Sequence, residues 1–499
     1  MTSNSVIVIG GGIAGLTAAS LLAKEGLSVT LLESHYQLGG CAGTFKRGKY
    51  IFDVGATQVA GFEEGGIHAQ IFKYLELPLP EAKLLDIACL VDLQDGLEPI
   101  TIWNDPIKWN QERKHQFPGS NKFWELCLTL HRINWAFMKR SPIIPVKNSW
   151  DLIQSFKALR LNMLPSGLFS RLTISDLLWI CDCQKDNRLK KFLDLQLKLY
   201  SQQPADKTSA LYGATVLQMG QYPLGLYHIK DSMQQLSNQL MKSLIINNGT
   251  ILYRHKVTRL QKKSNWMVNA VKSDGEDVQF KADNIIFSLP PQNLLNIITS
   301  DNIPESYKVR IEKLSKPSGA IVFYGAIKRT FLSKDLPLHV QIETIDLGSL
   351  FISISEDGDG RAPAGEATII ASAFTSTKEW FDLNQKEYKI QKQIAFNKIL
   401  TALNKWFKLK EEVWIHKELA TPKSFEFWTG REKGIVGGLG QDPSNFGLFG
   451  LSSRTPMKGL WLCGDSIYPG EGTAGVSQSA LIACRQLLAS KGSDIKISI

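Results

Sequence analysis

One stretch near the start of the chain, residues 6–33, restricts the possible fold more than any other part of the sequence. Residues 6–9 are four β-branched residues in a row, which is typical of a buried parallel strand, and a helical segment follows. Between them stand Gly10, Gly12 and Gly15 in the pattern G-x-G-x-x-G. The first glycine permits a tight turn, the second lets a pyrophosphate approach the backbone, and the third allows the helix and strand to pack closely. The stretch therefore predicts a dinucleotide-binding βαβ unit.

The second strand of this unit ends at Glu33, at the distance from the glycines that is typical of an acid that binds a ribose. The helix between the strands offers free N–H groups and the positive end of its dipole to the phosphates. Because a carboxylate can accept hydrogen bonds from a ribose diol, the acid favours NAD or FAD over a cofactor with a 2′-phosphate.

A second strand, loop and helix unit closes the chain. We predict a strand over 459–465, a glycine-rich loop over 466–475 and a helix over 476–489. Asp465 at the strand end can bind a sugar or ribityl hydroxyl, and the helix can point its positive end toward an electron-rich ring edge. The loop also contains Glu471, which could take up a proton from a substrate or could be a surface salt-bridge partner.

Composition limits the remaining alternatives. The seven cysteines are scattered and odd in number, which favours a reducing compartment, and no metal site is predicted. No uninterrupted apolar run approaches the ~20 residues that are needed to span a bilayer. The first strand begins at Val6, which leaves no room for a signal peptide.

Residues 101–200 carry most of the net charge of +10, with ten Lys and six Arg against eight acidic residues, and six of the twelve Trp. Within them, segment 159–180 is strongly apolar apart from Arg160 and Arg171, and could be a helical hairpin that meets lipid or a buried helix pair. Basic residues among Trp and Leu suit the surface of an anionic membrane, although they would also suit nucleic acid. The remaining alternative is a solvated basic face over an ordinary helical core.

Several segments resemble one family. They are the opening βαβ unit, the Gly39-Gly40 loop, residues 52–56, and the strings 58–61, 435–440 and 463–480. Together they resemble the FAD-dependent carotenoid desaturases and isomerases of the larger flavin amine-oxidase-like superfamily. The last three strings are most similar to the cyanobacterial C-3′,4′ carotenoid desaturases, which act late in the synthesis of myxol-type carotenoids.

The resemblance implies an α/β fold. It consists of a Rossmann-type FAD-binding domain, similar to para-hydroxybenzoate hydroxylase and amine oxidases, and a discontinuous α+β substrate domain. The FAD-binding domain is predicted over 1–66, 226–300 and 436–499. The substrate domain is predicted over 67–225, a mainly helical, membrane-facing insertion, and over 301–435. The implied FAD contacts are Gly10, Gly12, Gly15, Glu33, Gly39, Gly40, Gly55, Ala56, Val257, Gly464, Asp465, Gly475 and Val476.

The chain departs from the family pattern in two places. Family members commonly have an Arg in the loop that is here 41–45, and Arg47 is the nearest one. Many also have a Pro-x-Gly-Gly turn where this chain has Pro-Leu-Gly-Leu at 223–226. The first departure leaves the partner of the pyrophosphate open, and the second leaves the local substrate contact open.

The predicted reaction is carotenoid desaturation, in which flavin N5 accepts a hydride and the substrate also loses a proton. The predicted partners are a carotenoid, a membrane surface, and quinone or oxygen as electron acceptor, with no nucleic acid. The expected location is the cytoplasmic side of a membrane, with peripheral attachment. No catalytic acid or base is assigned. Two alternatives stay open: a cis–trans isomerase of the prolycopene type that uses reduced FAD, and a non-catalytic flavin-containing carotenoid-binding module. A water-soluble amine oxidase would not need the basic, Trp-rich insertion.

Overall fold

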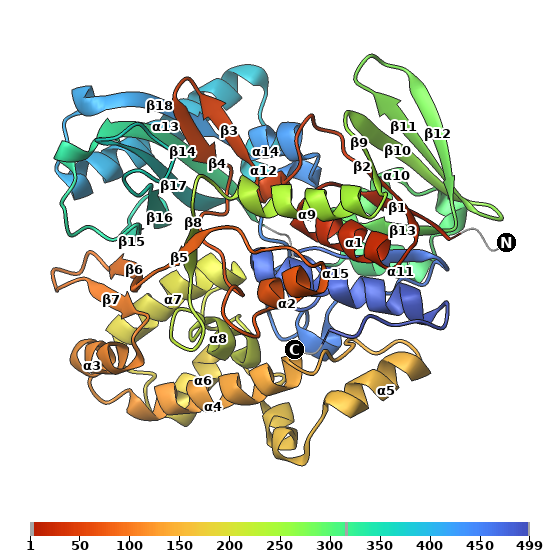
Figure 1. The fold of residues 1–499 in the computed structure, drawn as a ribbon. Helices are drawn as coiled ribbons and strands as arrows, with labels where there is room; N and C mark the ends of the chain where they lie inside the picture. The colour runs from red at the N-terminus through yellow and green to blue at the C-terminus, as the bar shows by residue number, and fades with distance from the viewer. Residues whose placement is uncertain (1–3, 315–317, 498–499) are drawn as a thin grey trace.

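The computed structural model describes residues 4–314 and 318–497, and its central element is a five-stranded parallel sheet (Figure 1). The strand order is β19-β13-β1-β2-β9, so the start, middle and end of the chain lie side by side. The strands are β1 (Ser5–Ile9), β2 (Ser28–Leu32), β9 (Thr250–Leu252), β13 (Asn284–Phe287) and β19 (Leu460–Leu462). The predicted Rossmann-type α/β fold is confirmed.

Three helices cover one face of this sheet: α1 (Ile13–Lys24), α9 (Gln234–Ile246) and α15 (Gly472–Ala489). Helix α1 packs against both of the others, and its residues are buried over nearly its whole length. Side chains alternate between the two faces of a strand, so Val6 and Val8 join the core under these helices. Ile7 and Ile9 point to the other face and join a second core.

That second core includes an antiparallel meander of β10 (His255–Lys262), β11 (Trp266–Lys272) and β12 (Asp277–Ala282). The segment just before the meander is divided between two sheets, because β9 ends at Leu252 and pairs in parallel with β2, and a separate strand begins at His255. The central sheet thus takes the first part of the segment and the meander takes the second.

A second large sheet is mixed and has seven strands, in the order β18-β14-β17-β16-β15-β6-β7. Strands β6 and β7 come from the region expected to be mainly helical, and β6 pairs in parallel with β15. The long helix α13 (Gln385–Phe407) covers this sheet and contributes to its core. The strands are β6 (Ile87–Asp92), β7 (Ile100–Trp103), β14 (Ser318–Lys328), β15 (His339–Thr344), β16 (Gly348–Ile354), β17 (Glu366–Ser376) and β18 (Trp414–Ala420).

A layer of helices from residues 106–216 lies at the far side of the molecule from the meander (Figure 1). The amphipathic pattern of α7 explains its position, since its apolar side chains enter one core with those of α4 and α6. The helices are α3 (Pro106–Gln116), α4 (Asn121–Met138), α5 (Ser149–Ala158), α6 (Ile174–Ile180), α7 (Asn187–Ser201) and α8 (Ala210–Val216), with a 3₁₀ segment at Leu161–Phe169.

Shorter elements connect these layers. Strands β3 (Thr44–Arg47) and β4 (Tyr50–Asp53) form one hairpin, and β5 (Ala82–Leu84) pairs with β8 (Tyr227–Ile229). The remaining helices are α2 (Ile67–Tyr74), α10 (Pro291–Ile297), α11 (Glu305–Glu312), α12 (Lys378–Phe381) and α14 (Pro422–Thr429).

Candidate functional site

The turn between β1 and α1 is shaped as a dinucleotide cradle. Gly10 has φ +95°, a conformation that side-chain-bearing residues rarely adopt. A Cβ on Gly15 would lie 1.9 Å from the carbonyl oxygen of Gly10, so only glycine allows helix and turn to pack this closely. A Cβ on Gly12 would meet no atom within 4 Å, so open space lies beside the N-terminus of α1. This space, next to free helix N–H groups, fits a pyrophosphate.

Glu33 is held beside this turn by backbone amides. Its Oε2 accepts a hydrogen bond from Gly11 N at 2.7 Å, and its Oε1 accepts one from His35 N at 2.7 Å. Burial raises the pKa of Glu33 and outweighs these hydrogen bonds, which lower it. The carboxylate therefore positions the glycine turn itself and also lines the space that a ribose would occupy.

The closing unit places a charged pair opposite the cradle. Arg431 Nη2 donates to Asp465 Oδ2 at 2.6 Å, and both side chains are largely buried. Burial lowers the pKa of Arg431, but the Asp465 charge outweighs this effect and the pKa is raised. Helix α15 begins at Gly472, four residues before the predicted start, so its free N–H groups lie in the predicted loop. Asp465 and the helix N-terminus together offer polar groups to a flavin.

Arg47, the nearest Arg in sequence to loop 41–45, lies elsewhere. Its guanidinium group is at the surface, where Nε pairs with Glu418 at 2.9 Å. Arg431 is the arginine that lines the cavity, and the sequence analysis missed it. Its position directly after a glycine that ends α14 was the available signal, because Gly430 has φ +66° and turns the chain.

Most of the implied FAD contacts come together in space although they are far apart in sequence. The structure brings them to the wall of one cavity, except Gly15, which packs beneath the turn, and Val257, which lies in β10 and does not line the cavity. Those in the wall are Gly10, Gly12, Glu33, Gly39, Gly40, Gly55, Ala56, Gly464, Asp465, Gly475 and Val476.

The cavity has a volume of about 910 Å³ and continues beyond the cradle, between the seven-stranded sheet and the helical layer. Its far part is mainly apolar, which suits a long hydrocarbon and not a small charged molecule. The apolar wall includes Ile133, Phe137, Met138, Leu159, Met163, Leu199, Val216, Met219, Leu226, Val322, Phe351 and Phe374.

The cavity reaches the surface at α5 and the 3₁₀ segment. Leu152, Phe156 and Leu164 line it and are also exposed. They belong to an apolar patch, which we define as Leu152, Ile153, Phe156, Leu161, Leu164 and Leu168, all exposed by 45–85%. Helix α5, which carries three of these side chains, lies at the lower edge of the molecule in Figure 1.

The Trp residues of segment 101–200 do not all belong to that surface. Trp109 and Trp124 are 2% exposed and pack edge to face in the core of the helical layer. Trp179 is 67% exposed. The prediction of a Trp-rich basic surface is therefore corrected for Trp109 and Trp124, which fill the core, and the exposed patch consists of Leu, Ile and Phe side chains.

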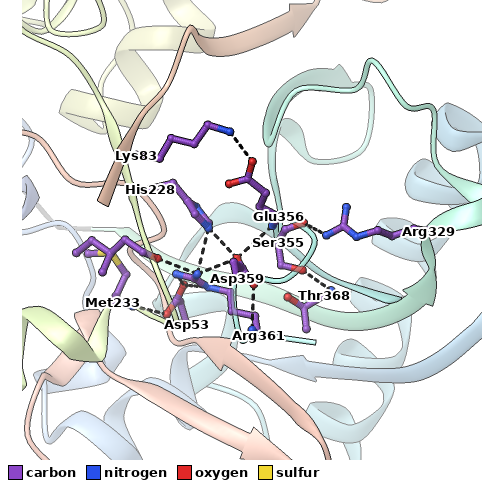
Figure 2. A network of polar contacts seen from close by, with 11 residues as sticks. Asp53, Lys83, His228, Met233, Arg329, Ser355, Glu356, Asp359, Arg361 and Thr368 are labelled. Carbon is purple, nitrogen blue, oxygen red and sulfur yellow. Dashed lines mark hydrogen bonds and ion pairs between the residues drawn. The ribbon is translucent and has the colours of Figure 1, made fainter. Parts of the chain in front are cut away.

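A buried polar network lies next to residues 54–57 of the cavity wall (Figure 2). Arg361 is 2% exposed and donates from Nε and Nη2 to Asp53 Oδ2, at 3.0 and 2.9 Å. Its Nη1 donates to Asp359 Oδ2 at 3.0 Å, and His228 Nε2 lies 2.8 Å from the same oxygen. Asp53 Oδ1 also accepts from Met233 N. The network thus joins β4, β8, the start of α9 and the β16–β17 loop.

Burial raises the pKa of Asp359. The hydrogen bond with His228 and the charge of Arg361 lower it by more, so the net shift is downward. Asp359 is therefore ionised and paired near neutral pH, and the network has a structural character.

Glu471 is different from these paired groups. Gln202 Nε2 donates to its Oε2 at 2.9 Å, whereas its Oε1 is buried and has no hydrogen-bond partner within residues 4–314 and 318–497. Burial raises the pKa of Glu471 well above its ordinary value. No ion pair of Glu471 occurs among the described residues, and the side chain lines the cavity. The surface salt-bridge alternative is therefore wrong.

The described residues contain neither a membrane-spanning helix nor a cluster of metal ligands. No helix there is both long and apolar enough to cross a membrane. Three or more His, Cys, Asp or Glu side chains that could hold a metal ion do not gather anywhere in that part of the chain.

Comparison with known proteins identifies the class and then the family. The fold is similar to that of two solved structures. An oxidoreductase from Methanosarcina mazei has a TM-score of 0.64 and 16% identity, and the match covers 98% of this chain and 100% of that one. The cyclohexylamine oxidase of Brevibacterium oxydans has a TM-score of 0.62 and 15% identity, and the match covers 97% of this chain and 100% of that one. The family of flavin containing amine oxidoreductases matches residues 13–488, so the chain belongs to this family. The predicted FAD cofactor is confirmed.

Two curated relatives indicate the kind of molecule on which similar chains act. Prolycopene isomerase 2 from an Oncidium hybrid cultivar is 25% identical over 514 residues, covering 99% of this chain and 85% of the relative. The all-trans-retinol 13,14-reductase of Danio rerio is 22% identical over 517 residues, covering 92% and 82%.

Proposed function

We propose that this protein is an FAD-dependent oxidoreductase that desaturates an apolar polyene, a carotenoid at its C-3′,4′ bond. The observation that carries the proposal is the cavity of about 910 Å³, which continues from the dinucleotide cradle into a mainly apolar space and opens at the apolar patch. A rod-like polyene needs such a space, since its end must reach the cofactor while its length is shielded from water. The names of the two curated relatives support a polyene substrate. The choice of bond rests on the closing string 463–480.

The residues present fit FAD. Gly12 and the start of α1 would hold the pyrophosphate, Glu33 the ribose, and Asp465 with residues 475–476 the flavin end. When bound, FAD supplies a two-electron acceptor. The apolar wall orients the substrate and excludes water, so the protein's main contribution is to position an unreactive C–H bond.

A product analysis tests the reaction. The holoenzyme is given a lycopene-derived carotenoid that is saturated at C-3′,4′, with a quinone or oxygen as acceptor. We expect a product with one more conjugated double bond and red-shifted absorbance. If the product instead has unchanged conjugation and forms only when FAD is reduced, the desaturase proposal is wrong.

Cis–trans isomerisation with reduced FAD is the second candidate. It is favoured by the relative named prolycopene isomerase, which aligns with 99% of this chain. The same product analysis separates the two reactions. The third alternative, a non-catalytic carotenoid-binding module, predicts bound pigment and no turnover with any acceptor.

We further propose peripheral attachment to the cytoplasmic surface of an anionic membrane through the apolar patch. Lys157, Arg160 and Arg171 are exposed beside its side chains and can contact anionic headgroups. Leu161 and Leu168 are 85% and 81% exposed and do not line the cavity. Burial of such side chains in lipid is worth about 1.5–3 kcal/mol each.

Vesicle binding tests this attachment. Leu161→Asp with Leu168→Asp should reduce binding to anionic vesicles at least tenfold, while Leu97→Asp, which is 63% exposed elsewhere, should not. Raised salt and Arg160→Glu with Arg171→Glu should also weaken binding. The proposal is contradicted if Leu161→Asp with Leu168→Asp binds vesicles as well as Leu97→Asp does, or if the wild type does not bind them.

The FAD contacts are tested at the glycine turn. Gly12→Val adds a side chain to open space at an ordinary φ of −71°, so the apoprotein should fold but bind no FAD. Unfolding curves check folding and flavin absorbance checks binding. Full FAD content in this variant would contradict the assignment of Gly12.

A further inference from the structure

Three carboxyl groups of the described residues line the cavity: Glu33, Asp465 and Glu471. Glu33 is occupied by two backbone amides at the nucleotide end, and Asp465 is paired with Arg431. Glu471 has a single amide donor and one oxygen without a partner among the described residues. Glu471 is thus the carboxyl group of the cavity wall that has an oxygen outside the structural contacts, where a proton can be gained or lost.

The orientation of Gln202 defines the hydrogen bond to Glu471. Ser318 N donates to Gln202 Oε1 at 3.2 Å, so the amide nitrogen of Gln202 faces Glu471 and donates to Oε2. Oε2 is therefore an acceptor in either protonation state of the carboxyl group. Oε1 is left as the oxygen that gains or loses a proton.

We propose that Glu471 exchanges a proton with the polyene at the flavin end of the cavity. The identity of the polyene rests on the proposed function, whereas the assignment of Glu471 rests on the wall geometry. In desaturation, one C–H bond breaks with its hydrogen and electron pair leaving together as hydride for the bound FAD. The neighbouring C–H bond breaks with its proton passing to Glu471, and its electron pair forms the new double bond.

The surroundings of Glu471 suit this exchange. Burial and the nearby charge of Asp465 raise the pKa of Glu471, and the hydrogen bond from Gln202 limits the rise. Tyr212 also interacts with Glu471, and its hydroxyl donates to the carbonyl oxygen of Tyr200. Burial raises the pKa of Tyr212 further above its ordinary value, so this phenol stays neutral. A carboxyl group with a raised pKa can accept a proton at high pH and return it at low pH.

An infrared titration tests the assignment without turnover. The holoenzyme labelled with ¹³C-glutamate should show a protonated-carboxyl band with a midpoint well above the ordinary value of about 4.3. Glu471→Gln should remove this band. Glu63→Gln is the matched control, because Glu63 is a buried glutamate with a raised pKa outside the cavity wall. It should remove a different band.

Turnover supplies the second measurement. Wild-type kcat should rise with pH through the infrared midpoint of Glu471. Glu471→Gln should lose about 10²–10⁴-fold in kcat with unchanged FAD content and carotenoid affinity. Glu471→Asp should recover part of the rate, and Glu63→Gln should keep it.

The outcomes separate the two proposals. If the wild type only isomerises its carotenoid, the desaturase proposal is wrong. The assignment of Glu471 is then supported if the isomerisation rate follows the infrared midpoint of Glu471 and falls in Glu471→Gln. Wild-type turnover by Glu471→Gln, or a midpoint near the ordinary value, overturns the assignment of Glu471.

Discussion

Two carboxyl groups of this protein, the buried Asp53 and the half-buried Glu471, have opposite surroundings. Asp53 accepts hydrogen bonds from Met233 N and from two nitrogens of Arg361, at 2.9–3.0 Å. Glu471 accepts one hydrogen bond from a neutral amide, and its other oxygen has no partner among the described residues. A buried charge is tolerated when it is paired and hydrogen-bonded, and is costly when it is not. Burial raises the pKa of both groups, but at Asp53 the charge of Arg361 limits the rise, whereas at Glu471 a single neutral amide does so. The first group therefore ties segments together through its contacts, and the second has an oxygen at which it can exchange a proton.

The largest effect on stability is expected when the buried network around Asp53 loses its cation, Arg361. Arg361→Met leaves Asp53 and Asp359 buried without their shared guanidinium group, which should lower the free energy of unfolding by about 3–5 kcal/mol. Urea unfolding of the holoenzyme measures this loss. Lys49→Met, which removes an exposed pair with Glu366, is the control and should change the midpoint little. Equal midpoints for both variants would show that the network does not stabilise the fold.

Replacing the carboxyl group by an amide should change the stability of the protein in opposite directions at Asp53 and Glu471. Asp53→Asn weakens charge-assisted hydrogen bonds and should destabilise the protein by about 1–3 kcal/mol. Glu471→Gln should stabilise it above neutral pH, because the amide removes the cost of ionising a buried group. Unfolding curves at several pH values measure both, and destabilisation by both variants at every pH would contradict the comparison.

The pH dependence follows from the raised pKa of Glu471. Between the unfolded pKa of about 4.3 and the folded pKa, the folded state keeps a proton that the unfolded state has lost. Stability from this group is thus full below about pH 4.3, falls as pH rises from there to the folded pKa, and changes no further above it. The advantage of Glu471→Gln should therefore be absent at low pH and grow with pH.

The smallest effect concerns the single hydrogen bond at Glu471. Gln202→Met removes the donor to Oε2, which stabilises the ionised form, so the infrared midpoint of Glu471 should rise. A hydrogen bond to a charged group is worth about 1.5–3 kcal/mol, which corresponds to about one to two pKa units. Gln203→Met is the control, and it should leave the midpoint unchanged. A lower midpoint in Gln202→Met would mean that Gln202 does not donate to the carboxylate.

Local sequence patterns were sufficient to predict the dinucleotide cradle but not the pair of Arg431 and Asp465 opposite it. The glycine turn and Glu33 were predictable because a strand, turn and helix within about 30 residues specify their own geometry. Arg431 was not predictable, because its partner Asp465 is 34 residues away in sequence. Arg47 is closer in sequence to loop 41–45, but it pairs with Glu418 at the surface. The buried Trp109 and Trp124 show the same limit, because Trp serves a core and a membrane surface equally well in sequence.

Glycines and an acid at short spacing were enough to predict the Rossmann-type unit and a cofactor with a free ribose diol, whereas FAD and the family were predicted from the resemblance of longer segments. The surroundings of each ionisable group, in contrast, come from tertiary packing. It paired Asp53 with Arg361 across 308 residues and left Glu471 with Gln202 across 269. The physical reason is that burial and charge pairing depend on which distant segments pack together, and these two quantities decide whether a carboxyl group is a structural contact or can exchange its proton.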